Sequence, residues 1–190
     1  MMLKPAQLYR DEISRKMINT WYDEKYMYYY DTSGKYENTI PDNCNYQRHF
    51  ASVDEYGNLI GYICYSFDDY SGYAKWFGIL SFTEKHNPEF GIDVLRVFDD
   101  IFYKFHLNRI EFSAFAKNPA IKAYRNFIKK YGGKEVCTLR ETNRLMDGMM
   151  HDSVIFEILY QDLVWLDSEG ISKMHKDREH FDNLKKEAKE

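Results

Sequence analysis

Cysteine is scarce in this sequence, with three residues, Cys44, Cys64 and Cys137, at wide spacing and no CxxC pair. An odd number of cysteines at this spacing predicts neither a disulfide framework nor a zinc knuckle. Cys64 lies inside an aromatic run and is expected to serve packing. The six histidines include no HxxxH or HExxH pair, so we expect no metal site.

Long apolar runs and an excess of basic charge are also missing. No uncharged apolar stretch approaches the ~20 residues that cross a bilayer, and residues 1–10 lack a basic segment followed by an apolar one. We therefore expect a cytoplasmic protein that makes no membrane contact. The 26 Lys and Arg are outnumbered by 30 Asp and Glu, the wrong balance for binding phosphate backbones, so no nucleic-acid partner is predicted.

The chain does have ample material for a core. Of its 190 residues, 44% are hydrophobic and 17% aromatic, which excludes wholesale disorder and a bare coiled coil. The length favours one domain with an appendage. We expect a single domain over residues 1–160, with N-terminal helices and a loop in 1–47 and a core sheet with two helices in 48–160. Residues 161–190 are predicted to form a charged C-terminal helix.

Apolar spacing between residues 5 and 30 predicts one or two helices. The tyrosine-rich run Tyr22–Tyr30 could line a binding surface, or its rings could be half-buried where helices meet a sheet. Residues 31–47 show no periodicity and are predicted to be a loop. The charged C-terminal helix could dock on its own domain, pair with a second copy or meet another protein.

From residue 48 the pattern is that of short strands. Strands are predicted over 50–54, 59–67 and 73–82, joined by the turn signals Gly57-Asn58 and 68–72, as in an antiparallel meander. An amphipathic helix of about 15 residues follows, marked by apolar residues from Val94 to Phe105, and then a strand over 109–116. Asn118-Pro119 opens a second helix that Gly132-Gly133 ends, and strands over 135–143 and 153–160 complete the order. The predicted class is α+β, a mostly antiparallel sheet of six to seven strands flanked by helices.

The region from Leu59 to Tyr160 resembles the GNAT superfamily of acyl-CoA-dependent N-acyltransferases. The sharpest match is the segment 118–124, in which Tyr124 follows Asn118 by six positions with an alanine between them. The pair Asp147-Gly148, the later Asp152 and an arginine, Arg140 or Arg144, match the last two strands of many members. The predicted element order is also that of the family.

This resemblance implies acetyl-CoA as the acyl donor and no metal. In the family, the strand that corresponds to 76–82 bulges and splays from its neighbour, and its free backbone groups pair with the pantetheine arm. The next helix N-terminus, a natural seat for phosphate, would hold the pyrophosphate. On this alignment the cofactor-binding residues are Leu80, Phe82, Lys85, His86, Asn87, Phe90, Gly91, Ile92, Asn118 and Tyr124.

The phosphate loop departs from the family pattern. The positions that carry Arg or Gln, then Gly, then Gly or Ala in the family are His86, Glu89 and Gly91 here. Glu89 and the nearby Asp93 favour a helix dipole with nothing bound and repel a pyrophosphate. Lys85 and a protonated His86 would compensate in part. The helix after Tyr124 is also longer than in the family.

The resemblance assigns chemistry to two residues. Tyr124 would be the general acid that protonates the departing thiolate, because a phenol of pKa ~10 can do so; it could instead only fill the apolar stripe of its helix. Asn118 could contact the cofactor or only cap that helix. Glu111 is a candidate base, if an apolar wall raises its pKa, but it could equally face solvent. Asp68, Asp69 and a water chain are alternatives.

Two functions follow. The first is an N-acetyltransferase that moves an acetyl group from acetyl-CoA to a primary amine by direct attack, with a small molecule or a protein or peptide amine as acceptor. The second is a non-catalytic GNAT-like binding module that meets a protein partner through its N-terminal aromatic region or its C-terminal helix. A homodimer is compatible with either function.

Overall fold

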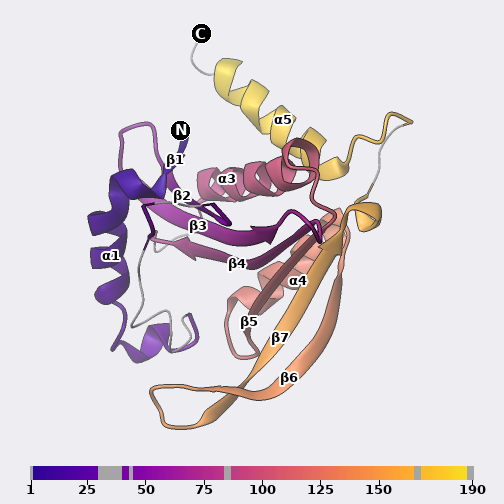
Figure 1. The fold of residues 1–190 in the computed structure, drawn as a ribbon. Helices are drawn as coiled ribbons and strands as arrows, with labels where there is room; N and C mark the ends of the chain where they lie inside the picture. Colours follow the sequence, from indigo (N-terminus) through magenta and orange to yellow (C-terminus); the bar gives the residue numbers. More distant parts are fainter. Residues whose placement is uncertain (1, 30–39, 43–44, 84–86, 165–167, 188–190) are drawn as a thin grey trace.

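In a computed structural model of the chain, the described residues are 2–29, 40–42, 45–83, 87–164 and 168–187. They contain one seven-stranded sheet with the order β1-β2-β3-β4-β5-β7-β6 (Figure 1). The strands are listed by their bounds as follows: β1 Met2–Pro5, β2 Gln47–Val53, β3 Leu59–Asp68, β4 Tyr73–Ser81, β5 Arg109–Phe115, β6 Lys134–Arg144 and β7 Met150–Leu159. The predicted α+β class and strand number are confirmed.

The described residues also form helices and short helical turns. They are listed with the short turns beside them: η1 Ala6–Tyr9, α1 Arg10–Ile18, η2 Glu24–Tyr26, α3 Pro88–Asp99, η3 Asp100–Lys104, α4 Ala120–Tyr131, η4 Tyr160–Asp162 and α5 Lys173–Glu187. The α3 helix begins at Pro88, six residues before Val94, the first residue of the apolar pattern that predicted it, and the turn that follows it, η3, is a π-helix. Gly132, at φ 103°, ends α4 as predicted.

Strands β2, β3 and β4 form the predicted antiparallel meander. Strand β1 was not predicted; it pairs antiparallel with β2, with Met2 opposite Val53. A four-residue strand that ends in proline carries too little alternation to be recognised in a sequence. Of the one or two helices predicted between residues 5 and 30, the structure has α1, flanked by the short turns η1 and η2, after the end of β1 at Pro5.

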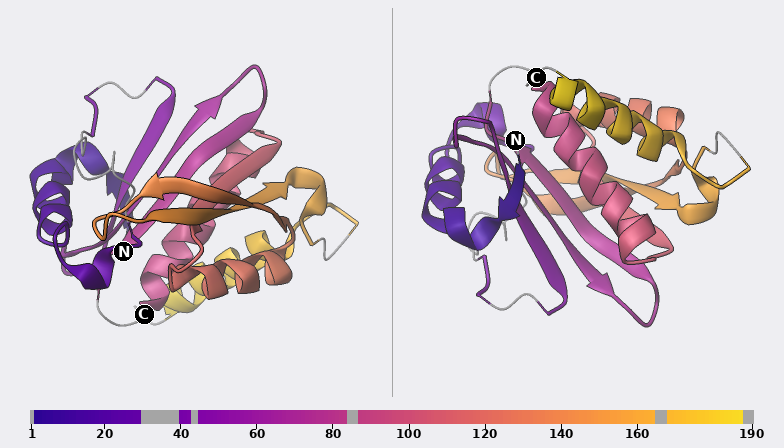
Figure 2. Two further views of the ribbon diagram at one scale, coloured as in Figure 1. Left: turned by 90° about the horizontal axis from the view of Figure 1, so that it is seen from below. Right: turned by 90° about the horizontal axis from the view of Figure 1, so that it is seen from above.

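Two hydrophobic clusters cover opposite faces of the sheet. On one face Ile63 and Phe77 pack with residues of α3 and α4, such as Phe98 and Ile121. On the other face Tyr62 packs with residues from α1 and its surroundings. Alternate residues of β3 therefore supply the two clusters, as the period of a strand requires. Figure 2 shows α3 and α5 together on one side and α1 on the other.

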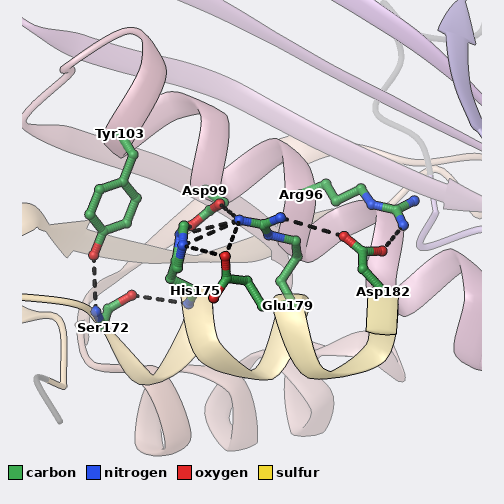
Figure 3. A network of polar contacts seen from close by, with 8 residues as sticks. Arg96, Asp99, Tyr103, Ser172, His175, Glu179 and Asp182 are labelled. Carbon is green, nitrogen blue, oxygen red and sulfur yellow. Dashed lines mark hydrogen bonds and ion pairs between the residues drawn. The ribbon is translucent and has the colours of Figure 1, made fainter. Parts of the chain in front are cut away.

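The C-terminal helix α5 docks on its own domain. Asp99 of α3 contacts His175 at 2.8 Å and Arg178 at 3.0 Å, and Arg96 bridges Asp93 and Asp182. Figure 3 shows this row of contacts between the two helices. Met174, 1% exposed, packs into the larger core. Docking, one of the three arrangements expected for this helix, is thus observed.

Among the described residues, no helix has the length and apolar character to cross a membrane.

Candidate active site

Strands β4 and β5 are neighbours in the sheet but pair over two residues at one end. Tyr73 lies opposite Arg109 and Ala74 opposite Ile110, in parallel orientation, and no further pairs follow although both strands continue. The strands therefore diverge toward their carboxyl ends, as the resemblance implies. In sheets with parallel strands, this is where ligands enter.

A bulge in β4 coincides with the start of the divergence. Ser66 of β3 faces Lys75 and Cys64 faces Gly78, so one residue of β3 lies opposite two residues of β4, Trp76 and Phe77. Trp76 has a positive φ of 57°. A bulge with its first residue in the left-handed region increases the local twist of a strand, which helps to turn β4 away from β5.

The register with β3 determines which main-chain groups of β4 face the gap. The backbone N–H of Phe82 donates to the carbonyl of Ile60, which makes this a hydrogen-bonded pair, and the alternation extends to Leu80 and Tyr62. The groups that point toward β5 therefore belong to Ile79 and Ser81. This corrects the prediction for Leu80 and Phe82 by one residue; their side chains pack on the α1 face.

The tip of α3 is capped by its own sequence. The side-chain oxygen of Asn87 accepts the backbone N–H groups of Glu89 at 2.9 Å and Phe90 at 3.3 Å, and its carbonyl accepts that of Gly91. Pro88 has no N–H. The N–H groups that a pyrophosphate would use are therefore already bonded. The predicted contacts of Lys85 and His86 lie outside the described residues.

The other residues of the predicted phosphate loop divide into buried and open positions. Phe90 and Ile92 are buried, and the Phe90 ring lies against Gly61, where an added Cβ would approach it to 2.2 Å. Asp93 is also buried; it accepts a hydrogen bond from Ser52 and pairs with Arg96, so it does not face the helix tip. Gly91 differs, because a Cβ there would meet nothing within 4 Å.

Tyr124 lies on the α4 face of the sheet, over β5 and β7. Its ring meets those of Phe112 and Phe156 edge-on, at 5.2 and 5.7 Å between centroids. Burial raises the pKa of its hydroxyl to about 12, so this phenol keeps its proton at neutral pH. The hydroxyl makes no hydrogen bond within the part of the chain that the structure describes. The raised pKa makes this phenol a weaker acid than a phenol in water, and the role of Tyr124 as general acid stays a prediction.

Asn118 uses both ends of its side-chain amide within the protein. Its oxygen accepts the backbone N–H of Ala120 at 2.8 Å, and its nitrogen donates to the carbonyl of Tyr28, also at 2.8 Å. The Tyr28 ring in turn meets His151 of β7 at 5.3 Å. Asn118 thus caps α4, and it also fastens the segment that follows α1 to the ends of β5 and β7.

Phe112 contacts Tyr124 and therefore points to the α4 face of the sheet. Because neighbouring side chains of a strand point to opposite faces, Glu111 lies on the other face. Its carboxylate accepts a hydrogen bond from Arg109 at 2.9 Å and another from the Tyr73 hydroxyl. Burial and this hydrogen bond raise the pKa of Tyr73 to about 12. Arg109 also pairs with Glu157 at 3.1 Å. The apolar wall expected around Glu111 is replaced by an ion-pair cluster at the closed end of the gap.

A polar chain on the α1 face was not predicted. His49 Nδ1 lies 2.6 Å from the Tyr62 hydroxyl, and Nε2 lies 3.0 Å from Gln47. Burial lowers the pKa of His49, while burial raises the pKa of the Cys64 thiol, which hydrogen-bonds to Tyr62. The pairing of β2 with β3 brings His49 to Tyr62, while the two-residue period of each strand places Gln47 beside His49 and Cys64 beside Tyr62. The cross-strand contact is not visible as a local motif in the sequence. The buried thiol fits the predicted packing role of Cys64.

The tyrosines of the N-terminal aromatic run have mixed surroundings. Tyr22 is exposed, whereas Tyr26 and Tyr29 contact each other and Tyr28 packs on His151; Tyr30 lies outside the described residues. This run therefore supplies contacts between α1 and the far end of the sheet as well as exposed rings. Within the described ranges, no group of three or more His, Cys, Asp or Glu could hold a metal ion.

Solved structures share this architecture. The chain is similar to spermidine N-acetyltransferase SpeG from Vibrio cholerae in complex with CoA and spermine, at 20% identity over 85% of this chain and 96% of that one, with a TM-score of 0.62. A point mutant of the same enzyme matches at 23% identity over 84% and 95%, with a TM-score of 0.61. No family model and no curated protein matches the sequence. The chain therefore has the fold of the GNAT N-acyltransferases, as the motif around Asn118 and Tyr124 predicts.

Proposed function

We propose that this protein is an N-acetyltransferase that uses acetyl-CoA and acts on a primary amine. The observation that carries the proposal is the divergence of β4 from β5 after two residue pairs, because it leaves the edge of β4 free for an extended ligand. The fold supports the same activity, since similar structures are described as spermidine N-acetyltransferases.

The residues present fit the pantetheine part of the cofactor better than its pyrophosphate. Main-chain groups of Ile79 and Ser81 point into the gap and would bind an extended amide chain as a further strand would. At Gly91 the surface is open where a side chain would otherwise stand. A pyrophosphate at the tip of α3 would need the Asn87 side chain to turn away from the two N–H groups that it accepts.

Acetyl-CoA supplies an acyl group on a thiolate leaving group, and the protein contributes position and protons. The amine would approach on the α1 face, while the thiol end lies near α4. Tyr124, whose phenol keeps its proton at neutral pH, would give that proton to the leaving sulfur. A backbone N–H at the gap would bind the acyl oxygen. Glu111, which Arg109 holds, or one of the alternatives Asp68, Asp69 and a chain of water molecules would take the proton of the attacking ammonium.

Spermidine and spermine are the first acceptors to test, because the similar enzymes are described with these amines. Isothermal titration of the full chain with acetyl-CoA and CoA, followed by a thiol-release assay with each amine, tests the proposal. We expect heat of binding and amine-dependent release of thiol. No heat at millimolar ligand would remove the enzyme proposal and leave the binding module. A cytoplasmic location and a homodimer stay predictions from the sequence.

A further inference from the structure

Trp76 occupies a backbone conformation that its side chain makes costly. It is the first residue of the β4 bulge, at φ 57°, a region that glycine adopts freely and that residues with a Cβ avoid. Glycine is the usual residue at the first position of such a bulge. A tryptophan at this position therefore works against the local fold.

Packing of the side chain does not offset the energetic cost of this backbone conformation. The Trp76 side chain is 75% exposed, and it has no ring, cation or hydrogen-bond partner among the described residues. Other aromatic residues nearby are engaged, as in the stacking of Arg109 on Tyr73 at 4.8 Å. A strained residue with an exposed, unused ring is a pattern that points to function rather than to stability.

The position of Trp76 suggests what the ring meets. It lies two residues after Ala74, which forms with Ile110 the last pair of β4 and β5 at the closed end of the gap. If the helix tip holds the phosphate end of an acyl-CoA and the arm runs back along β4, the thioester lies near this end. The first unpaired residue of β5 here, Glu111, already pairs with Arg109, so the indole itself would supply the attraction for an organic ammonium.

We infer that Trp76 is a binding residue for the acceptor, which it holds by placing its indole face against the aliphatic ammonium. This inference rests on the proposed function and deepens it. It assigns to Trp76 a contact with the amine and not with acetyl-CoA. The cost of the strained backbone then serves to hold the ring at the entrance used by the amine.

The substitution Trp76→Gly separates fold from function, because glycine relieves the positive φ while it removes the ring. We expect an unfolding temperature at or above that of the wild type, an unchanged Kd for acetyl-CoA, and a KM for spermidine raised between about twofold and thirtyfold. Trp76→Phe should lie between the two. Tyr56→Ala, which removes an aromatic ring that is 83% exposed on another turn, should leave all three quantities unchanged.

Tryptophan fluorescence gives a readout independent of turnover. Spermidine should shift the emission of the wild type but not that of Trp76→Phe, and a neutral diol of similar length should have no effect. If acetyl-CoA binds and is turned over but KM for spermidine is the same in Trp76→Gly, the role of Trp76 is refuted alone. If the Trp76-dependent shift occurs but acetyl-CoA neither binds nor reacts, the acetyl-transfer proposal fails and the ammonium site stands.

Discussion

The side-chain oxygen of Asn87 accepts the backbone N–H of Glu89 at 2.9 Å and so occupies the place where a phosphate oxygen would bind at the tip of α3. A helix start presents unpaired N–H groups to an anion only if its own cap leaves them free. Asn87, and not the acidic Glu89, is therefore the residue that competes most directly with a pyrophosphate.

Replacing Asn87 with alanine should change stability and cofactor affinity in opposite directions. The variant loses a helix cap, which costs about 1 kcal/mol of unfolding free energy. The same change frees the N–H groups of Glu89 and Phe90 for the pyrophosphate, so the Kd for CoA should fall severalfold. Chemical denaturation and isothermal titration of the same preparation measure both effects.

Asp23→Ala is the matched control for this substitution. Asp23 caps the short η2 turn by accepting the N–H of Lys25 at 2.9 Å, far along the chain from the tip of α3. Its loss should leave CoA affinity unchanged. An Asn87→Ala protein that is less stable but binds CoA as the wild type does would show that the helix tip takes no part in binding.

The sequence predicts most of the fold because short local sequence signals mark its turns. Gly57-Asn58 and the segment 68–72 place the two hairpins of the meander, and Gly132 marks the end of α4. The start of α3 is less visible, since the apolar spacing begins clearly at Val94. The actual start depends on the cap that Asn87 supplies and on the fit of Phe90 against Gly61.

The site was less predictable because it depends on register. The motif locates Asn118 and Tyr124, but which of two alternating residues of β4 turns its backbone toward the gap is decided by pairing with β3 across the bulge. For the same reason His49 and Tyr62, thirteen positions apart, meet only in the sheet. A single sequence records neither the bulge nor the register shift, so these features had to come from the structure.

Tyr124→Phe should reduce turnover while sparing the fold. Phenylalanine keeps the edge-on contacts with Phe112 and Phe156, so the unfolding temperature and the Kd for acetyl-CoA should be those of the wild type. Loss of a general acid typically lowers the rate about a hundredfold or more. Steady-state thiol release with spermidine measures this. Tyr131→Phe, on the same helix but hydrogen-bonded to Asp177, serves as control, and equal turnover in both variants would rule out Tyr124 as the acid.

Asp182→Asn should loosen the docking of α5. The half-buried carboxylate pairs with Arg96 and with Arg178, at 3.4 Å for the latter, and its neutral replacement leaves both guanidinium groups short of a partner. We expect a loss of about 1–3 kcal/mol in unfolding free energy, measured by urea denaturation. Glu187→Gln, exposed near the end of the same helix, should change stability little. Equal values for the two variants would show that the row of contacts in Figure 3 does not hold the helix.

His49 predicts a specific dependence of stability on pH. Burial lowers the pKa of its imidazole below the ordinary value of 6.5, so the unfolded chain takes up this proton at a higher pH than the folded protein does. The stabilisation is therefore complete above about pH 6.5 and is lost as the pH falls through the folded pKa. Between pH 7.5 and 5, the urea midpoint of the wild type should fall more than that of His49→Gln. Carboxylates titrate alike in both proteins and cancel in the comparison. His180→Gln, which alters an exposed histidine on α5, should follow the wild-type curve. Parallel curves for wild type and His49→Gln would mean that burial does not keep this ring neutral.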